Sequence, residues 1–195
     1  MTLTNEEVLK IFSETEALLN GHFLLTSGRH SNVYFQCAKV LQHPKYTKLI
    51  CSNLVEHFKD MSIETVIAPA MGGLIVGYEI ARQLNARFIF TEREDKIMQL
   101  RRGFSLQKNE RVLICEDVVT TGGSVFEVID IVKKFEAEIV GVAYIVDRSN
   151  GKVNFGYEQK SVLALDAVSF PADDCKLCNE AIPLVKPGSR KVLSA

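Results

Sequence analysis

The chain has no hydrophobic run long enough to span a membrane, and it has no excess of either charge. Its 23 basic and 24 acidic side chains give a net charge of −1, which favours neither nucleic acid nor an anionic membrane as a partner. The first residues lack the basic and apolar regions of a signal peptide. Internal repeats and low-complexity linkers are also missing. We therefore expect a cytoplasmic, single-domain protein of 195 residues.

Cysteines are few, odd in number and scattered, at Cys37, Cys51, Cys115, Cys175 and Cys178. This pattern argues against a disulfide framework and indicates a reducing compartment. Cys175 and Cys178 form a CxxC pair, but a structural zinc site needs four ligands, and the sequence shows no second CxxC or nearby His pair. We interpret both thiols as part of a C-terminal loop and assign no residue as a metal ligand. A metal shared across a dimer is the less favoured alternative.

Apolar periodicity predicts the order of the secondary structure. A capping box from Thr4 to Glu7 begins a helix that should reach about Asn20, and two short strands follow between residues 22 and 37. A helix is expected over 44–58, and strands near residues 65, 88, 112, 140 and 162 are mostly separated by helical patterns. The sequence therefore predicts an α/β fold with a doubly wound parallel sheet. We expect an N-terminal helix and hood over about 1–42, a core over about 43–170 and an irregular tail over 171–195.

The most informative stretch runs from Arg111 to Ser124. A buried strand ends in two acids, and a Gly/Thr turn then opens an amphipathic helix. Carboxylates can accept hydrogen bonds from vicinal hydroxyls, and a small-residue turn at a helix N-terminus can surround a phosphate. An ordinary strand-to-helix turn is the alternative, but the adjacent acids favour a sugar-phosphate site. The stretch has neither the P-loop ending nor the dinucleotide Gly spacing. The predicted binding residues are Glu116, Asp117, Val118, Val119, Thr120, Thr121, Gly122, Gly123 and Ser124.

Other strand ends should meet this stretch at one edge of the sheet. The segments concerned are 69–73, 92–103, 116–124 and 147–148. Residues 70–73 form a second small-residue turn, which suggests a ligand with two phosphate groups, although a tight turn without a ligand is equally compatible. Residues 92–103 hold four basic and three acidic side chains. They could be a solvated loop, or a mobile cationic lid over an anionic leaving group.

Several of these segments together resemble the orotate phosphoribosyltransferases, which are type I phosphoribosyltransferases. The resemblance covers nearly the whole chain and rests on His22-Phe23-x-Leu25-x-Ser27-Gly28, Leu100-Arg101-Arg102-Gly103-Phe104, Glu116 to Ser124, Arg148, and the tail from Ile182 to Ser189. It implies transfer of a phosphoribosyl group from phosphoribosyl pyrophosphate (PRPP) to orotate. It also implies a type I core with a small hood and a flexible lid loop, a Mg²⁺ cofactor, and a homodimer whose lid reaches the neighbouring site.

The resemblance also implies roles for individual residues. The acids would hold the ribose hydroxyls of PRPP, with Asp117 counted among the catalytic residues, and the turn would hold the 5′-phosphate. Thr120 and Arg148 would contact orotate. Many relatives carry Lys where this chain has Thr26 and Gly72, and many have a lid His that is missing here. The lid cations Arg93, Lys96, Arg101 and Arg102 must then supply the positive charge, so we predict Arg93 and Lys96 as PRPP-binding and catalytic, with Lys96 the principal one.

Two rival functions remain open at this point. A purine or other pyrimidine phosphoribosyltransferase would share the PRPP signature, but the Phe23 to Gly28 segment and Arg148 speak against it. A regulator that binds PRPP without reacting would be expected to lack a charged lid and to carry a basic DNA-binding extension. The charged lid and the absence of such an extension favour the enzyme.

Overall fold

The computed structural model describes residues 2–25, 28–165 and 169–187. Thr26, Ser27, Gly188 and Ser189, which contributed to the interpretation of the sequence, lie outside the described residues. None of the helices in the described ranges is both long and apolar enough to cross a lipid bilayer.

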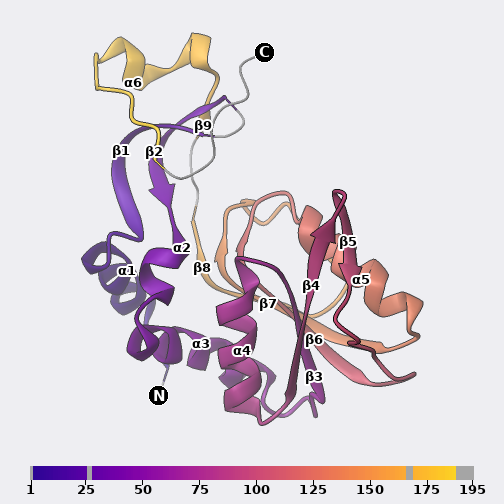
Figure 1. Cartoon of the computed structure of the whole chain (residues 1–195). Helices are drawn as coiled ribbons and strands as arrows, with labels where there is room; N and C mark the ends of the chain where they lie inside the picture. Colours follow the sequence, from indigo (N-terminus) through magenta and orange to yellow (C-terminus); the bar gives the residue numbers. More distant parts are fainter. Residues whose placement is uncertain (1, 26–27, 166–168, 188–195) are drawn as a thin grey trace.

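The main sheet has six strands in the order β5-β4-β3-β6-β7-β8 (Figure 1). All neighbouring pairs are parallel except β4 and β5. This confirms the predicted fold class. The strands are β3 (Thr65–Pro69), β4 (Arg87–Glu94), β5 (Ile97–Leu100), β6 (Arg111–Val119), β7 (Glu138–Asp147) and β8 (Gln159–Ala164).

Helices cover both faces of this sheet, which explains why its central strands are apolar almost throughout. On one face, Val66, Leu113 and Ile145 share a core cluster with side chains of α3 and α4. On the other face, Ile67 and Ile114 pack with side chains of α5. The helices are α2 (Cys37–Leu41), α3 (Pro44–Phe58), α4 (Gly73–Leu84) and α5 (Gly123–Lys134).

The hood is a second, three-stranded sheet that stands apart from the main one (Figure 1). Its strands are β1 (Leu18–Leu24), β2 (His30–Phe35) and β9 (Ser169–Phe170), and it is preceded by α1 (Asn5–Glu14). The C-terminal tail returns to the hood: a 3₁₀ turn (Ala172–Asp174) and α6 (Lys176–Asn179) follow β9, and Val185 bridges to Phe23. Within its described part, the tail expected to be irregular therefore contains short ordered elements. The division at about 42 and 170 stays a prediction.

The first helix is shorter than its sequence suggested. The capping box of Thr4 and Glu7 is present, but α1 ends at Glu14 rather than near Asn20. Leu18 and Leu19 belong to β1, where they pair with Phe35 and Tyr34 of β2. Pairing with a strand more than ten residues away thus outweighs the local helical period, as tertiary contacts often do.

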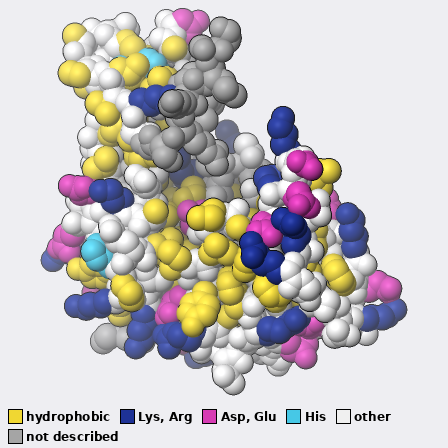
Figure 2. Space-filling model, viewed as in Figure 1, with side chains coloured by type: hydrophobic (Ala, Val, Ile, Leu, Met, Phe, Trp, Pro, Cys, Tyr) yellow, Lys and Arg dark blue, Asp and Glu magenta, His cyan; other side chains and the backbone are white. Residues whose placement is uncertain are grey.

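The charged segment 92–103 was expected to be a loop, and this was wrong for residues 92–94 and 97–100, which belong to strands. β4 and β5 form an antiparallel hairpin, with Glu94 paired to Ile97. Asp95 and Lys96 both have positive φ, 50° and 68°, as a two-residue hairpin turn requires. Basic and acidic side chains lie side by side on this hairpin (Figure 2). We call β4, the turn and β5 the lid hairpin.

Candidate active site

The segments that follow β3, β4, β6 and β7 meet at one edge of the main sheet, because these strands are parallel neighbours. This confirms the predicted grouping of residues. The turn after β3 comes into contact with the end of β6 there. A Cβ atom at Gly72 would lie 2.5 Å from Oδ1 of Asp117, so a side chain cannot be added at Gly72 unless Asp117 moves.

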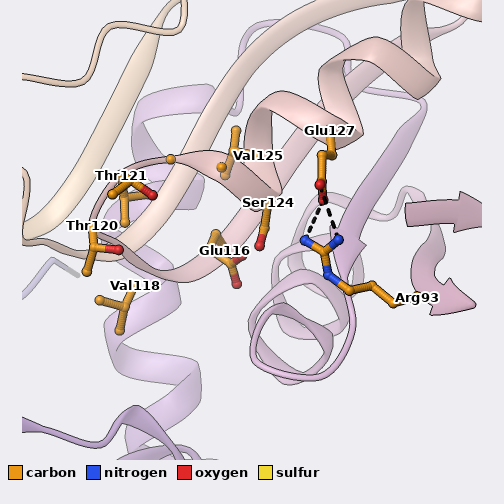
Figure 3. Close-up of a pocket in the computed structure, with 11 residues that line it drawn as sticks. Arg93, Glu116, Val118, Thr120, Thr121, Ser124, Val125 and Glu127 are labelled. Atoms are coloured by element: carbon orange, nitrogen blue, oxygen red, sulfur yellow. Dashed lines mark hydrogen bonds and ion pairs between the residues drawn. The ribbon is translucent and has the colours of Figure 1, made fainter. Parts of the chain in front are cut away.

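A pocket of about 290 Å³ opens at the end of β6 (Figure 3). It is lined by residues 118–125 together with Arg93, Glu116 and Glu127. The side chains of Thr120, Thr121 and Ser124 surround the turn that leads into α5. Three kinds of hydrogen-bonding group, namely hydroxyls, a carboxylate and a guanidinium, therefore line this pocket.

Gly122 gives the turn its shape. It precedes α5 with φ of 75°, a conformation that favours glycine. A Cβ atom there would also lie 2.9 Å from side-chain atoms of Val153 and Phe155. The first N–H groups of α5 have no partner inside the helix and carry the positive end of its dipole. Because residues 122–125 line the pocket, the helix start is placed to bind an anion such as phosphate.

Of the acid pair at the end of β6, Glu116 is buried and Asp117 is partly buried. Burial, with a smaller effect from the neighbouring charge of Asp117, raises the pKa of Glu116 to about 9. Burial also raises the pKa of Asp117. The backbone holds both side chains: the Asp117 N–H donates to Glu116 Oε1 at 3.0 Å, and the Val118 N–H donates to Asp117 Oδ1 at 2.8 Å. The ligand-free pair therefore retains a proton at neutral pH.

Most of the predicted lid cations, which lie on the lid hairpin or directly after it, are already paired with acids. Arg93 reaches the pocket but holds both carboxylate oxygens of Glu127 on α5 and donates to the Lys96 carbonyl oxygen (Figure 3). Arg101 and Arg102 pair with Glu92, and Arg101 also with Glu94. Lys96, exposed in the hairpin turn, has no ion pair within the described parts of the chain.

Arg148 lies just after β7, and its side chain is partly buried. Its backbone N–H donates to Val119 O at 2.8 Å, and its guanidinium carbon lies 5.7 Å from the ring centre of Phe35 in the hood. Burial lowers the pKa of the guanidinium. Its Nε is one of two buried side-chain atoms without a hydrogen-bond partner among the described residues. An unpaired buried donor of this kind suits an anionic ligand between the sheet and the hood.

The structure thus places the predicted site residues in three groups. Arg93, Glu116 and residues 118–124 share the pocket. Asp117 lies against Gly72, beside the pocket rather than in its lining. Lys96 and Arg148 lie outside the lining, in the lid turn and beside Phe35. The sequence reasoning missed Val125 and Glu127. No local sequence pattern identifies Glu127 as a residue of the site, because its partner Arg93 is 34 residues away.

A separate group of side chains lies in the hood. Cys175 and Cys178 were expected to have no nearby His pair, and this expectation was wrong. The β1–β2 hairpin brings His22 and His30 to them, and the four ligand atoms all lie within 4.8 Å of one another. The two histidines are separated from the cysteines by more than 140 residues, which is why their proximity was not evident from spacing.

The raised pKa of Glu116 makes stability depend on pH. The folded protein keeps a proton on this carboxyl up to about pH 9, whereas the unfolded chain loses it near the ordinary value of 4.5. The free energy of unfolding should therefore fall as pH rises from about 5 to 9, by up to about 1.4 kcal/mol per unit. The Tm of Glu116→Gln should therefore change less with pH over this range than the Tm of the parent. Thermal melts by circular dichroism at pH 5, 7 and 9 measure this, with the exposed Glu6→Gln as control. Parallel curves for the parent and Glu116→Gln would contradict it.

Comparison with known proteins agrees with this geometry. Residues 37–173 match the phosphoribosyl transferase domain family. A protein of Caldicellulosiruptor saccharolyticus named orotate phosphoribosyltransferase is 57 % identical over 190 residues, which are 97 % of this chain and all of that protein. One of Desulforamulus reducens with the same name is 54 % identical with the same coverage. The crystal structure of the orotate phosphoribosyltransferase of Aeropyrum pernix superposes with a TM-score of 0.71 at 26 % identity, over 81 % of this chain and 93 % of that one. The chain belongs to the orotate phosphoribosyltransferase family, within the phosphoribosyl transferase domain family.

Proposed function

We propose that the protein transfers the 5-phosphoribosyl group of PRPP to orotate, which gives orotidine 5′-monophosphate and pyrophosphate in pyrimidine biosynthesis. One observation carries the proposal: a pocket suited to phosphate and an acid pair with raised pKa lie at the same sheet edge as Arg148, whose buried Nε has no hydrogen-bond partner among the described residues. The first two features suit a phosphorylated sugar, and the third suits an anionic base. The names of the relatives support the same reaction.

The phosphoribosyl group fits the pocket at the end of β6. The N–H groups of the α5 start, with the hydroxyls of Thr120, Thr121 and Ser124, bind the 5′-phosphate. The carboxyls of Glu116 and Asp117 accept hydrogen bonds from the ribose hydroxyls. Because such bonds favour the ionised acid, binding of the sugar releases the proton that the ligand-free pair holds.

The same acid pair suits a Mg²⁺ ion. Its donors are all oxygens, which hard cations prefer, and a cation would compensate the burial of two carboxylates. Glu116 and Asp117 are the residues that would hold the ion, directly or through the sugar hydroxyls. When bound, Mg²⁺ neutralises negative charge on the pyrophosphate of PRPP.

The turn at 70–73 and the lid hairpin bind the pyrophosphate group of PRPP in this proposal. Gly72 lies against Asp117, so this turn borders the sugar site on the side of β3. The bond from C1 to pyrophosphate weakens in the transition state, and negative charge grows on the leaving oxygens. Lys96, exposed and without an ion pair, can be directed at that charge when the lid closes, and Arg93 joins it once it leaves Glu127.

Orotate occupies the space between the end of β7 and the hood. The planar guanidinium of Arg148 pairs with the orotate carboxylate, and Thr120 contacts the ring from the PRPP side. Orotate is already an anion, so its N1 needs no strong base to attack C1 of the ribose. The protein therefore acts by orienting the two substrates and stabilising the leaving group.

We also propose a cytoplasmic homodimer whose lid reaches the neighbouring site. Met71, just before α4, and Ile75 and Tyr78 on α4 are 81 %, 47 % and 59 % accessible. Ile75 and Tyr78 are three residues apart and so lie on one side of the helix, and hydrophobic side chains gather over α4 in Figure 2. Ile97 of the lid hairpin is also 63 % exposed. Covering these side chains with a second copy would remove them from water and bring a lid to the interface.

An assay of base consumption tests the reaction. With PRPP and Mg²⁺ present, the protein should consume orotate and leave uracil, adenine and hypoxanthine unchanged. Arg148→Ala should lower kcat/KM for orotate by roughly 10²-fold with little change in the KM for PRPP, because it removes a buried charged partner. Arg111→Ala, at the opposite end of β6, is the matched control and should behave as the parent. Equal effects of Arg148→Ala on both substrates would remove Arg148 from the base pocket.

The lid cation has its own test. Lys96→Ala should lower kcat by a factor on the order of 10², because the transition state loses a positive charge near the leaving group. Lys108→Ala removes a surface lysine that pairs with Glu136 and should leave kcat unchanged. Steady-state rates at saturating substrates measure both. A near-normal kcat for Lys96→Ala would make the hairpin turn an ordinary solvated turn.

The dimer is tested by light scattering after size exclusion. The parent should elute as a dimer, and Tyr78→Asp should raise its dissociation constant by roughly 30-fold or more, because a charge replaces an aromatic contact. Asp130→Lys changes an exposed residue of α5, on the other face of the sheet, and should leave the dimer intact. A monomeric parent, or a Tyr78→Asp protein as dimeric as the parent, would refute this interface.

A further inference from the structure

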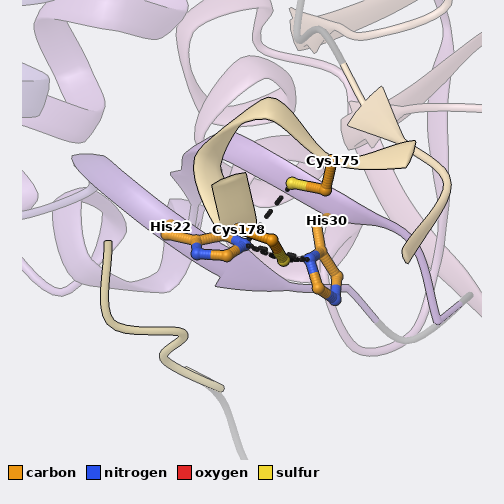
Figure 4. A group of neighbouring side chains, drawn as sticks. All are labelled: His22, His30, Cys175 and Cys178. Carbon is orange, nitrogen blue, oxygen red and sulfur yellow. Dashed lines mark hydrogen bonds between the residues drawn. The ribbon is translucent and has the colours of Figure 1, made fainter. Parts of the chain in front are cut away.

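Four side chains that metal ions commonly use converge inside the hood. His22 comes from β1, His30 from β2, Cys175 directly precedes α6, and Cys178 lies within α6; their side chains point toward one another (Figure 4). Three of them, His22, His30 and Cys175, are only 2 %, 5 % and 2 % accessible, whereas Cys178 is exposed. None of the four lines the PRPP pocket.

The spacing of the ligand atoms matches a tetrahedral zinc site. Zinc binds Cys sulfur at about 2.3 Å and His nitrogen at about 2.0 Å, which places sulfur and nitrogen about 3.5 Å apart in a tetrahedron. In the hood, Sγ of Cys175 lies 3.6 Å from Nε2 of His22. Sγ of Cys178 lies 3.7 Å from the same atom and 3.3 Å from Nδ1 of His30. The two ring nitrogens are 2.9 Å apart, so an ion between them would separate them by a few tenths of an ångström.

The orientation of His22 is fixed from outside the cluster. Its Nδ1 lies 2.7 Å from the carbonyl oxygen of Ile182 in the tail. A carbonyl only accepts, so Nδ1 carries the proton and Nε2 presents its lone pair to the cluster. Metal-binding histidines are typically held in this way by a hydrogen bond from the other ring nitrogen.

The cluster also occupies the place where this part of the hood would need a hydrophobic core. Neither of the two core clusters includes a residue from 20–32 or 169–187. Phe23 is buried there, with its ring against Tyr34, but it belongs to neither core cluster. Small units without enough apolar surface are commonly stabilised by a structural metal.

We propose that His22, His30, Cys175 and Cys178 bind one structural zinc ion that fastens the C-terminal tail to the β1–β2 hairpin. Two thiolates and two imidazoles in tetrahedral spacing favour zinc among the divalent metals. Each thiol releases its proton when the metal binds, and the two thiolate charges then cancel that of the ion. With four protein ligands the ion has no open position, so its role is to hold the hood together rather than to take part in the reaction.

The metal content of the protein tests this directly. Protein without an affinity tag, expressed with zinc supplied and dialysed against metal-free buffer, should retain about one zinc per chain by mass spectrometry of the metal. Cys175→Ser, Cys178→Ser and His22→Ala should each retain much less. Cys51→Ala and His57→Gln remove a thiol and an imidazole elsewhere and should keep the zinc.

Two measurements on the parent protein keep the test valid if a variant fails to fold. Cobalt added after zinc removal should give the visible bands of a tetrahedral Co²⁺ ion and a thiolate charge-transfer band. Zinc should raise the Tm by roughly 5 °C or more and slow hydrogen exchange in β1 and β2, with little change in β6. Protein without bound zinc and without a tetrahedral cobalt spectrum would overturn the proposal. A disulfide between Cys175 and Cys178 in freshly purified protein would overturn it in favour of a redox pair.

Discussion

The burial of two carboxylates at the end of β6 is the constraint on which the rest of the site depends. Glu116 and Asp117 lie near the end of a strand that is covered on both faces, so burial raises the pKa of both and the pair retains a proton when no ligand is bound. Their position requires Gly72 in the neighbouring turn, because Asp117 fills the space of any side chain there. The cost of burying these acids is offset only when hydroxyls or a cation meet them. An unliganded site of this kind is prepared for a sugar and is unfavourable without one.

Helix α5 connects the pocket at the end of β6 to the lid hairpin. Its first turn borders the pocket, and one turn later Glu127 holds Arg93 of the lid hairpin. Both partners of this ion pair are about 40 % exposed, and exposed pairs of this kind contribute at most about 1 kcal/mol. The pair therefore fixes the lid only weakly. In the proposed reaction, Arg93 would exchange the Glu127 carboxylate for phosphate oxygens of PRPP, and binding at the pocket would then release this contact between the lid hairpin and α5.

Those parts of the fold that follow from local pattern could be predicted from the sequence. The apolar runs of β3, β6 and β7 indicated a sheet covered on both faces, and the stretch from Thr120 to Ser124 indicated a small-residue turn at the start of a helix, which lines a pocket in the structure. The features that depend on distant pairing could not be predicted. Leu18 and Leu19 fit a helix as well as a strand until β2 pairs with them. The sequence around Arg93 does not indicate that Glu127 is its partner. The CxxC pair likewise does not indicate that His22 and His30 lie beside it.

The contact of the tail with the hood sets the order in which parts of the chain fold during synthesis on the ribosome. The strands that form the phosphate cradle, from β3 to β8, are complete once residue 164 has been made. The hood cannot be completed then, because Cys175, Ile182 and Val185 have still to leave the exit tunnel before they can reach β1. The first strands of the chain must therefore wait for its last residues, while the sheet between them folds. A chain that ended before the tail would contain the complete main sheet and its pocket, but its hood would lack the contacts that the tail makes with β1.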